Sequence, residues 1–343
     1  CLWNMFIFFQ STIGRSDLFC NLIENGRCFI QRIRPFRFGV FCFLGVILFG
    51  FQVAAAEKLD GRPPMGAGKG WFSRYEGGMV HQLKTELDGG GDFEVNRFVS
   101  RVSVGYRSDY LNSTALSIGY SRDAYDFSGS TGFATSDPWG EINTMSVGLP
   151  IRRSIGDKWM LFAVPSARLL AEDHADLNDS LVGGGIAGVS YEVNPRLKLG
   201  PGLGALTQLE DGASYFPIVI VDWKISEKLK LETGRGLGAS QGPGLLLTYS
   251  WSDSWSFLAG GRYERLRFRL NRNGATPNGV GEDSGVSAYL GARYTLGERG
   301  VLTLFGGADV LGEFQIYDSS GNEIGSRDYK AAPFLGVSTS LRF

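Results

Sequence analysis

Cysteine is scarce in this chain and is confined to one end of it. The 343 residues include four cysteines, at Cys1, Cys20, Cys28 and Cys42, and none follows. A disulfide framework and a thiolate metal site are therefore excluded from everything after residue 42. A periplasmic, oxidising environment would pose no risk to that part of the chain.

Histidine is equally scarce, with two residues, His81 and His174. No H-x-x-x-H pair or cysteine cluster exists, so a zinc site has no support. A lipid hydrolase or acyltransferase would need a histidine beside a nucleophile, and His174, in EDHADLNDS with Ser180 nearby, comes closest to that arrangement. We interpret both histidines as solvated or interfacial. We expect no enzyme activity, no catalytic, cofactor-binding or metal-binding residue, and no cofactor.

An excess of basic charge is also missing. Charged residues make up 20% of the chain and the formal net charge is −1. Residues 1–56 hold five Arg and two acids, so 29 basic and 33 acidic residues remain beyond them and the net charge there is −4. A nucleic-acid partner would need a basic stripe, and we expect no such partner.

Acidic residues gather in two stretches that we expect to be loops. One stretch contains Asp173, Asp176 and Asp179, and the other contains Glu282 and Asp283. Such carboxylates could bind a divalent cation, but neither spacing is that of an EF-hand. Solvated acidic loops are the better interpretation.

The N-terminus carries an export signal. RIRPFR at 32–37 supplies positive charge, GVFCFLGVILFGFQ follows as an apolar run, and VAAAEK places small residues at Ala54 and Ala56. This order indicates a secretory signal peptide cleaved after Ala56. An uncleaved membrane anchor is the alternative, because the apolar run is almost long enough to span a bilayer.

These features divide the chain into four parts. Residues 1–31 are an upstream extension without a folding pattern, and 32–56 are the predicted signal peptide. Residues 57–70 form a flexible segment with two prolines and several glycines, and 71–343 form the folded unit.

Within the folded unit, apolar and polar side chains alternate with a period of two. FVSRVSVGYRS has one apolar face and one polar or small face. The apolar face holds Phe98, Val102, Val104 and Tyr106, and the other holds Arg101, Ser103, Gly105 and Arg107. RLKLGPGLG and SAYLGARYTL repeat the pattern, which no helical spacing fits. Such runs, apolar toward lipid and polar toward a lumen, are typical of transmembrane barrel strands.

Fourteen segments follow this pattern, although twelve strands remain possible. They are 71–84, 96–107, 111–122, 141–152, 158–170, 181–192, 195–208, 214–225, 228–233, 244–251, 255–267, 285–296, 300–313 and 330–343. Alternate connections are short: SDYL, SIGDK, VNP, SEK, SDS and GERG. The others are mostly longer and include 123–140, 171–180, 268–284 and 314–329. Short periplasmic turns and longer outer loops predict an all-β, antiparallel, up-and-down barrel in a bacterial outer membrane.

Aromatic residues and the C-terminus agree with that prediction. Two girdles of rings are expected where the barrel crosses the two membrane interfaces. Near the short turns lie Tyr106, Trp159, Tyr191, Trp223, Trp251, Trp255 and Tyr294, and at the opposite ends lie Phe98, Tyr120, Tyr215 and Tyr263. The last strand, AAPFLGVSTSLRF, alternates up to Leu341 and a terminal Phe343. In outer-membrane barrels such an ending resembles the signal that the barrel assembly machinery reads, so we expect that machinery as a partner.

From about residue 197 to 343 the chain resembles a bacterial family known only as a domain of unknown function and assigned to the outer-membrane barrels. The resemblance is carried by LKLGPGLG, FPIVIVDWKI, GPGLLLTYSWSDSW, GGRYERLRFRL, GVGEDSG, GNEIGSRDY and APFLGVSTSLRF. It implies the fold and the location, and it implies no activity.

The alternation also predicts which charged side chains face the lumen. They are Arg101, Arg107, Arg168, Lys198, Asp222, Lys224, Arg262, Glu264, Arg293 and Asp309, with Lys230 and Arg342 on the same face. These charges could line a water-filled pore and set its ion preference. They could equally pair across strands and hold the wall together.

The sequence therefore favours a passive channel or uptake pore for small solutes, with a mixed-charge lumen. A non-conducting structural or adhesion barrel is one alternative. A transporter of hydrophobic ligands is another, suggested by Phe216, Ile218 and Ile220 on one inward face. An outer-membrane lipid enzyme is the least favoured. Membrane lipid and lipopolysaccharide are the expected surroundings, and the oligomeric state is left open.

Overall fold

A computed structural model describes residues 69–233 and 244–343. The predicted extension, signal peptide and cleavage site, and nearly all of the predicted flexible segment, lie outside the described residues and stay predictions. The described part is 74% β-strand, with two short 3-10 helices, Phe133–Ser136 (η1) and Asn178–Ser180 (η2). Neither is long and apolar enough to cross a membrane.

The strands follow one another along the chain with brief connections. They are β1 Gly70–Glu86, β2 Asp92–Arg107, β3 Ser113–Ser128, β4 Glu141–Gly148, β5 Ile151–Ile155, β6 Trp159–Glu172, β7 Leu181–Asn194, β8 Leu197–Gln208, β9 Asp211–Lys224, β10 Leu229–Thr233, β11 Gly244–Ser250, β12 Trp255–Arg269, β13 Val280–Leu296, β14 Gly300–Tyr317, β15 Glu323–Tyr329 and β16 Ala332–Arg342.

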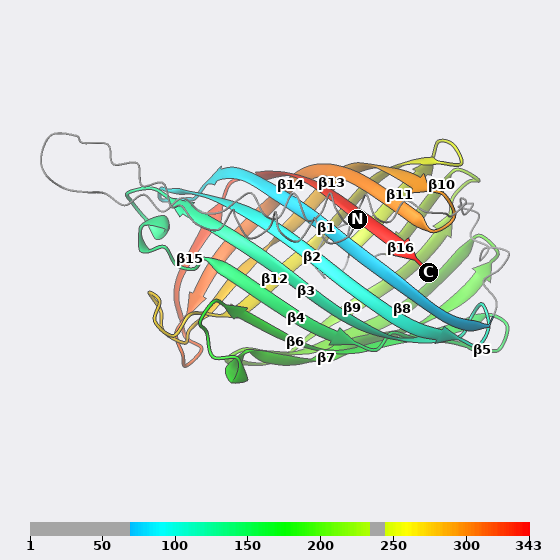
Figure 1. The fold of residues 1–343 in the computed structure, drawn as a ribbon, viewed down its shortest axis with the longest axis horizontal. Coiled ribbons are helices and arrows are strands. Elements are labelled where there is room, and N and C mark those ends of the chain that lie inside the picture. Colours follow the sequence, from blue (N-terminus) through cyan, green and yellow to red (C-terminus); the bar gives the residue numbers. More distant parts are fainter. Residues whose placement is uncertain (1–68, 234–243) are drawn as a thin grey trace, which may run out of the picture. The chain divides into compact units, whose positions relative to one another are not determined.

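These strands close into one antiparallel barrel of fourteen wall positions (Figure 1). Strands β4 and β5 together fill one position between β3 and β6, and β15 and β16 together fill the position after β14. The pairing of β1 with β16 closes the ring, with Tyr75 opposite Leu341. The predicted fold class and the count of fourteen are confirmed.

Near the short turns, the wall of the barrel has the expected apolar outer face and polar inner face. The side chains that point outward are large, apolar and exposed, as a lipid-facing surface requires. They include Trp71, Val102, Val104, Leu116, Ile118, Met145, Val147, Leu199, Leu203, Val219, Leu245, Phe257, Leu290, Leu304 and Leu335. Near the short turns, aromatic rings pair across neighbouring strands. Ring centroids are 4.8 Å apart for Trp159 and Tyr191, and 4.9 Å apart for Trp255 and Tyr294.

The short turns lie at one end of the barrel, and the other connections lie at the opposite end, which we call the loop end. Three of the predicted long loops are wrong in extent. Strand β3 runs to Ser128 and β4 begins at Glu141, so the connection is 129–140. Strand β12 runs to Arg269 and β13 begins at Val280, so the connection is 270–279. Strand β14 runs to Tyr317 and β15 begins at Glu323, so the connection there is 318–322.

The physical reason is that the two faces exchange polarity beyond the apolar band. Toward the loop end, the inward faces carry buried Phe268 and Phe314, while Arg265 and Arg267 stand on the opposite face of β12. Arg265 and Arg267 line the lumen cavity, so that face of β12 meets polar surroundings instead of lipid. A pattern that is apolar outside and polar inside therefore ends before the strands do.

Glu282 and Asp283 correct a second expectation. They do not lie in a solvated acidic loop, because both belong to β13 and are only 3% and 6% exposed. The acids Asp173, Asp176 and Asp179 do lie in the connection around η2, between β6 and β7.

Candidate functional site

The lumen is the candidate site, and it holds one large cavity that extends from the short turns to residues beside the β8–β9 connection, such as Leu209 and Ser214. Its volume is about 1370 Å³, and strands from all around the barrel line it. Residues of the short turns, among them Arg196, Lys228 and Arg299, line its mouth. A cavity of this size exceeds the few hundred to ~1,000 Å³ that usually encloses a small molecule.

The structure places the predicted lumen residues in four different surroundings. Six line the large cavity: Arg101, Arg168, Lys198, Asp222, Lys224 and Arg293, together with Lys230 and Arg342. Glu264 and Asp309 line a smaller chamber of about 70 Å³ nearer the loop end, and Arg168 lines both spaces. Arg107 lies over the ring of Phe72, 5.3 Å from its centroid. Arg262 is buried in the wall beside Glu264.

Most of these charges pair with a neighbour on the wall. Arg101 lies 3.6 Å from a carboxylate oxygen of Glu76, and Lys198 lies 2.9 Å from one of Glu192. Lys230 lies 3.2 Å from Asp222. Among the described residues, Arg168 makes no such pair, and the charge that acts on it is the like charge of Arg101.

One wall of the cavity is apolar. Val164 on β6 stands in register with Ile186 on β7, and Phe216 and Ile218 follow on β9. Glycines on the intervening strand make room for these side chains. A Cβ atom added at Gly204 would lie 2.1 Å from the Phe216 ring, so the ring lies flat against the wall. The lumen is therefore apolar on the β6–β9 side and polar or charged elsewhere.

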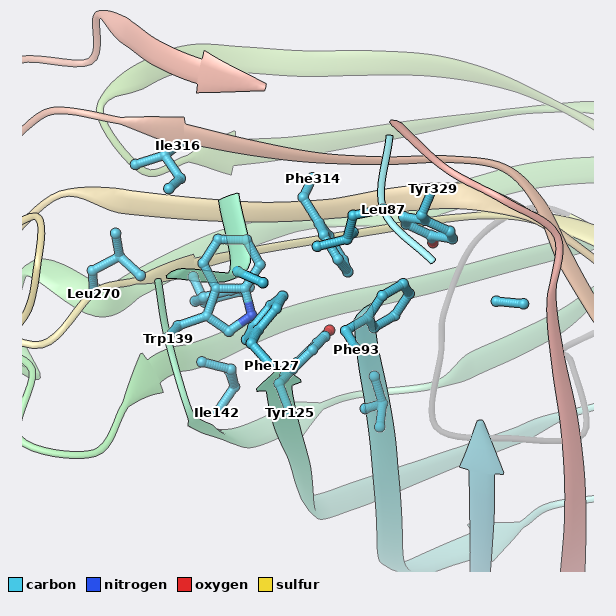
Figure 2. Close-up of a cluster of buried hydrophobic side chains, with 14 of the residues drawn as sticks. Leu87, Phe93, Tyr125, Phe127, Trp139, Ile142, Leu270, Phe314, Ile316 and Tyr329 are labelled. Carbon is cyan, nitrogen blue, oxygen red and sulfur yellow. The ribbon is translucent and has the colours of Figure 1, made fainter. Parts of the chain in front are cut away.

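An aromatic core fills one side of the loop end. Inward side chains of β2, β3, β12, β14 and β15 meet the segment after η1 there (Figure 2). Phe93 and Phe314 are fully buried, with ring centroids 4.7 Å apart, and Trp139 lies 5.2 Å from Phe268. Phe127 and Tyr125 complete the contact. This core is made by the wall strands and the β3–β4 connection.

A layer of buried polar groups lies directly beneath this core. Asp283 accepts hydrogen bonds from the hydroxyls of Tyr125 and Tyr329, at 2.7 and 3.0 Å, and from a guanidinium nitrogen of Arg97, at 3.1 Å. Arg97 also lies 3.8 Å from a carboxylate oxygen of Asp123. Buried charges are costly unless they are paired and hydrogen-bonded, and this layer meets that condition.

Arg269 ties three loop-end segments together. It is 3% exposed and donates to the backbone oxygens of Asp179 and Asn278 at 2.8 Å each. Its guanidinium also lies 2.7 Å from a carboxylate oxygen of Glu210. The top of β12 is thereby fixed to the connections that follow β6 and β8.

Sequence reasoning missed the aromatic core and the polar layer. Phe93, Tyr125, Phe127 and Phe268 all lie outside the predicted strands, in segments predicted as connections. A signal was present, because continuing the alternation of the neighbouring strands places all four on the lumen face. A run of aromatic residues on the lumen face indicates a filled section of barrel, whereas charged residues indicate a solvated one.

The histidines are separate from the cavities. His81 is exposed on β1, and its Nδ1 lies 2.9 Å from the side-chain oxygen of Asn96. His174 lies in the connection after β6, where its φ angle is 67°. The hydroxyl of Ser180 donates to the Asp176 carbonyl oxygen. No group of three or more potential metal ligands occurs in residues 69–233 and 244–343.

The chain belongs to a family described as a domain of unknown function (DUF6268), whose model matches residues 122–341. No curated protein sequence matches it.

Solved outer-membrane barrels resemble it weakly. An outer membrane channel of Pseudomonas putida F1 is 11% identical with a TM-score of 0.45, over 84% of this chain and 100% of that one. The toluene transporter TodX of P. putida is 12% identical with a TM-score of 0.39, over 81% and 91%. The translocator domain of the autotransporter NalP of Neisseria meningitidis is 15% identical with a TM-score of 0.34, over 89% and 95%. Because all three TM-scores are below 0.5, no transport property of those proteins is assigned to this chain.

Proposed function

We propose that the protein is a passive uptake channel of the outer membrane for small solutes, in a state whose loop end is closed. The observation that carries this proposal is the cavity of about 1370 Å³ that runs into the barrel from the short-turn end. Barrels of eight strands are filled by side chains, whereas larger ones enclose water or ligands. A purely structural barrel has no need of such a space.

The closed loop end separates this proposal from a permanently open pore. Phe93, Phe314 and Trp139 fill the loop end beside β2, β3 and β14, so on this proposal steady ion flow requires the aromatic core to open. The same closure favours a second candidate, a non-conducting envelope barrel. The two differ in whether conduction appears once the core is made smaller.

Single-channel recording in planar bilayers tests the proposal with the full protein purified from membranes. The wild type should give rare or small steps. The double variant Phe93→Ala/Phe314→Ala removes two rings from the occluded section, and it should give frequent, larger steps. Val104→Ala, on the lipid face of β2, is the matched control and should behave as the wild type.

Folding of each variant is checked by the change in gel migration on heating. A correctly folded double variant that stays silent would overturn the channel proposal and favour the non-conducting barrel. Wild-type protein with large, permanently open steps would contradict the closed state.

A further inference from the structure

One row of residues across the wall brings two arginines together over two small side chains. The row runs through neighbouring strands in direct register: Arg101 on β2, Gly119 on β3, Ser146 on β4 and Arg168 on β6. At about 4.8 Å per strand, the two arginine Cα atoms are about 14 Å apart. The long guanidinium side chains therefore flank a shallow floor made by Gly119 and Ser146.

The floor between the two arginines is open because residue 119 is a glycine and has no side chain. A Cβ atom added there would lie 2.7 Å from the hydroxyl of Ser146 and 3.6 Å from Nε of Arg101. Arg101 thus leans over the glycine toward Ser146. The Ser146 hydroxyl makes only a long hydrogen bond, 3.4 Å, to the Gly119 carbonyl oxygen.

Arg168 gives the site a positive charge that no ion pair of the described residues balances. Glu76 is the carboxylate that pairs with Arg101, at 3.6 Å, and it also lies 3.5 Å from Arg74. Arg168 has no ion-pair partner among the described residues, although it lies inside the barrel. An unpaired charge in such a place is costly unless water or a ligand neutralises it.

A buried hydroxyl next to Arg168 also has no partner. The Thr144 side-chain oxygen makes no hydrogen bond, and the residue is 6% exposed. Thr144 lies two residues from Ser146 on the same inward face of β4, and it lines the small chamber with Arg168. A free donor beside a free guanidinium is what an oxyanion would use.

We propose that Arg101, Arg168 and Ser146 bind the carboxylate of a small organic acid whose apolar body lies along the β6–β9 wall. Val164 lies four residues before Arg168 on β6, about 13 Å away along the strand at ~3.3 Å per residue. Ile186 and Phe216 extend that apolar surface in register with Val164. An aryl or short alkyl carboxylate has a charged end and an apolar body in this order. This inference deepens the proposed function by naming the class of solute.

Isothermal titration calorimetry on the full protein in detergent tests the site with three probes: benzoate, the neutral benzamide and inorganic phosphate. Benzoate should bind more tightly than either of the others. Arg168→Gln keeps the size of the side chain and removes the charge, and it should weaken benzoate binding roughly tenfold or more, as expected for a lost charge-assisted hydrogen bond. Arg168→Lys should bind with intermediate affinity.

Arg152→Ala is the matched control, because Arg152 also lines the cavity but lies near its mouth on β5. It should bind benzoate as the wild type does. Equal benzoate affinity in the wild type and Arg168→Gln, both folded, would overturn the site. Benzamide binding as tightly as benzoate would overturn the role of the charge, and phosphate binding as tightly would overturn the role of the apolar wall.

Failure of the site and failure of the channel can be told apart. Benzoate binding that depends on Arg168 in a barrel that never conducts supports the site and removes the channel. Conduction in the Phe93→Ala/Phe314→Ala variant without benzoate binding overturns the site and leaves the channel.

Discussion

Asp283 is a buried carboxylate whose charge is balanced from three directions. Two tyrosine hydroxyls and the Arg97 guanidinium donate to it, directly below the aromatic core. A buried ion pair adds little net stability over a well-packed apolar pair, but loss of one partner leaves a charge without compensation. Arg97 also forms an ion pair with Asp123, so replacing Arg97 deprives two carboxylates of their cation.

Replacing Arg97 by Met should therefore destabilise the barrel strongly. We expect the free energy of unfolding to fall by about 3 kcal/mol or more, the range for breaking a buried pair. Urea unfolding in lipid vesicles, followed by tryptophan fluorescence, measures it. Lys330→Met breaks a pair with Glu86 whose partners are about two-thirds exposed, and it should change stability little. Equal effects of the two variants would contradict the role assigned to the polar layer.

At the scale of elements, the two ends of a barrel strand have different surroundings. Near the short turns, β12 to β14 present apolar residues to lipid and polar residues to the cavity. Nearer the loop end, the same strands bury Phe268, Phe314 and Ile316 inside. The result is a wall that continues beyond the membrane band and is plugged by its own inward side chains.

This exchange of faces explains what could be predicted from sequence. Fourteen strands, the short turns and the inward positions of residues such as Arg101 follow from a period of two, which has a local cause in strand geometry. The paired state of Glu282 with Arg265 and Arg267 was not predictable, because it depends on which strands lie beside one another. The pairing of β12 with β13 turns an apparent acidic loop into a buried ion-pair cluster.

The alignment of Arg101 with Arg168 in one row across the wall was unpredictable for the same reason. Each residue was predicted to face the lumen from its own strand alone. Their alignment through Gly119 and Ser146 is set by register across four strands, which the sequence of one chain does not specify.

The turn between β2 and β3 gives a test of one short connection. Asp109 accepts hydrogen bonds from the backbone N–H groups of Leu111 and Asn112, and from the Asn112 side chain. These bonds, the side-chain one most of all, lower the pKa of Asp109. Because the pKa is lowered, the ionised Asp109 carboxylate stabilises the fold fully above the ordinary carboxyl pKa of about 4. This stabilisation is lost as the pH falls through the lowered pKa.

Asn112→Ala should raise the pKa of Asp109 toward its ordinary value. NMR titration of the Asp109 carboxyl carbon in micelles measures the change. Ser320→Ala, in a turn at the other end of the barrel, is the control and should leave it where it was. An unchanged Asp109 pKa in Asn112→Ala would contradict the hydrogen-bonded turn.

At the scale of the whole molecule, the barrel is asymmetric along its axis. Its cavity of about 1370 Å³ opens between the short turns, and its loop end holds the aromatic core and the contacts of Arg269. In the proposed closed state, this end is sealed. With an outer-membrane orientation, the cavity would face the periplasm and the sealed end the exterior. A solute would then have to pass the core to enter the cell.

Thiol labelling tests this asymmetry most directly, because no cysteine occurs after Cys42. Ser338→Cys places a thiol in the cavity, and Ser320→Cys places one in the connection 318–322 at the loop end. On intact cells, a membrane-impermeant maleimide should label Ser320→Cys and not Ser338→Cys, and opening the outer membrane should allow Ser338→Cys to react. Labelling of Ser338→Cys on intact cells, or failure of Ser320→Cys to react there, would contradict a barrel sealed at its outer end.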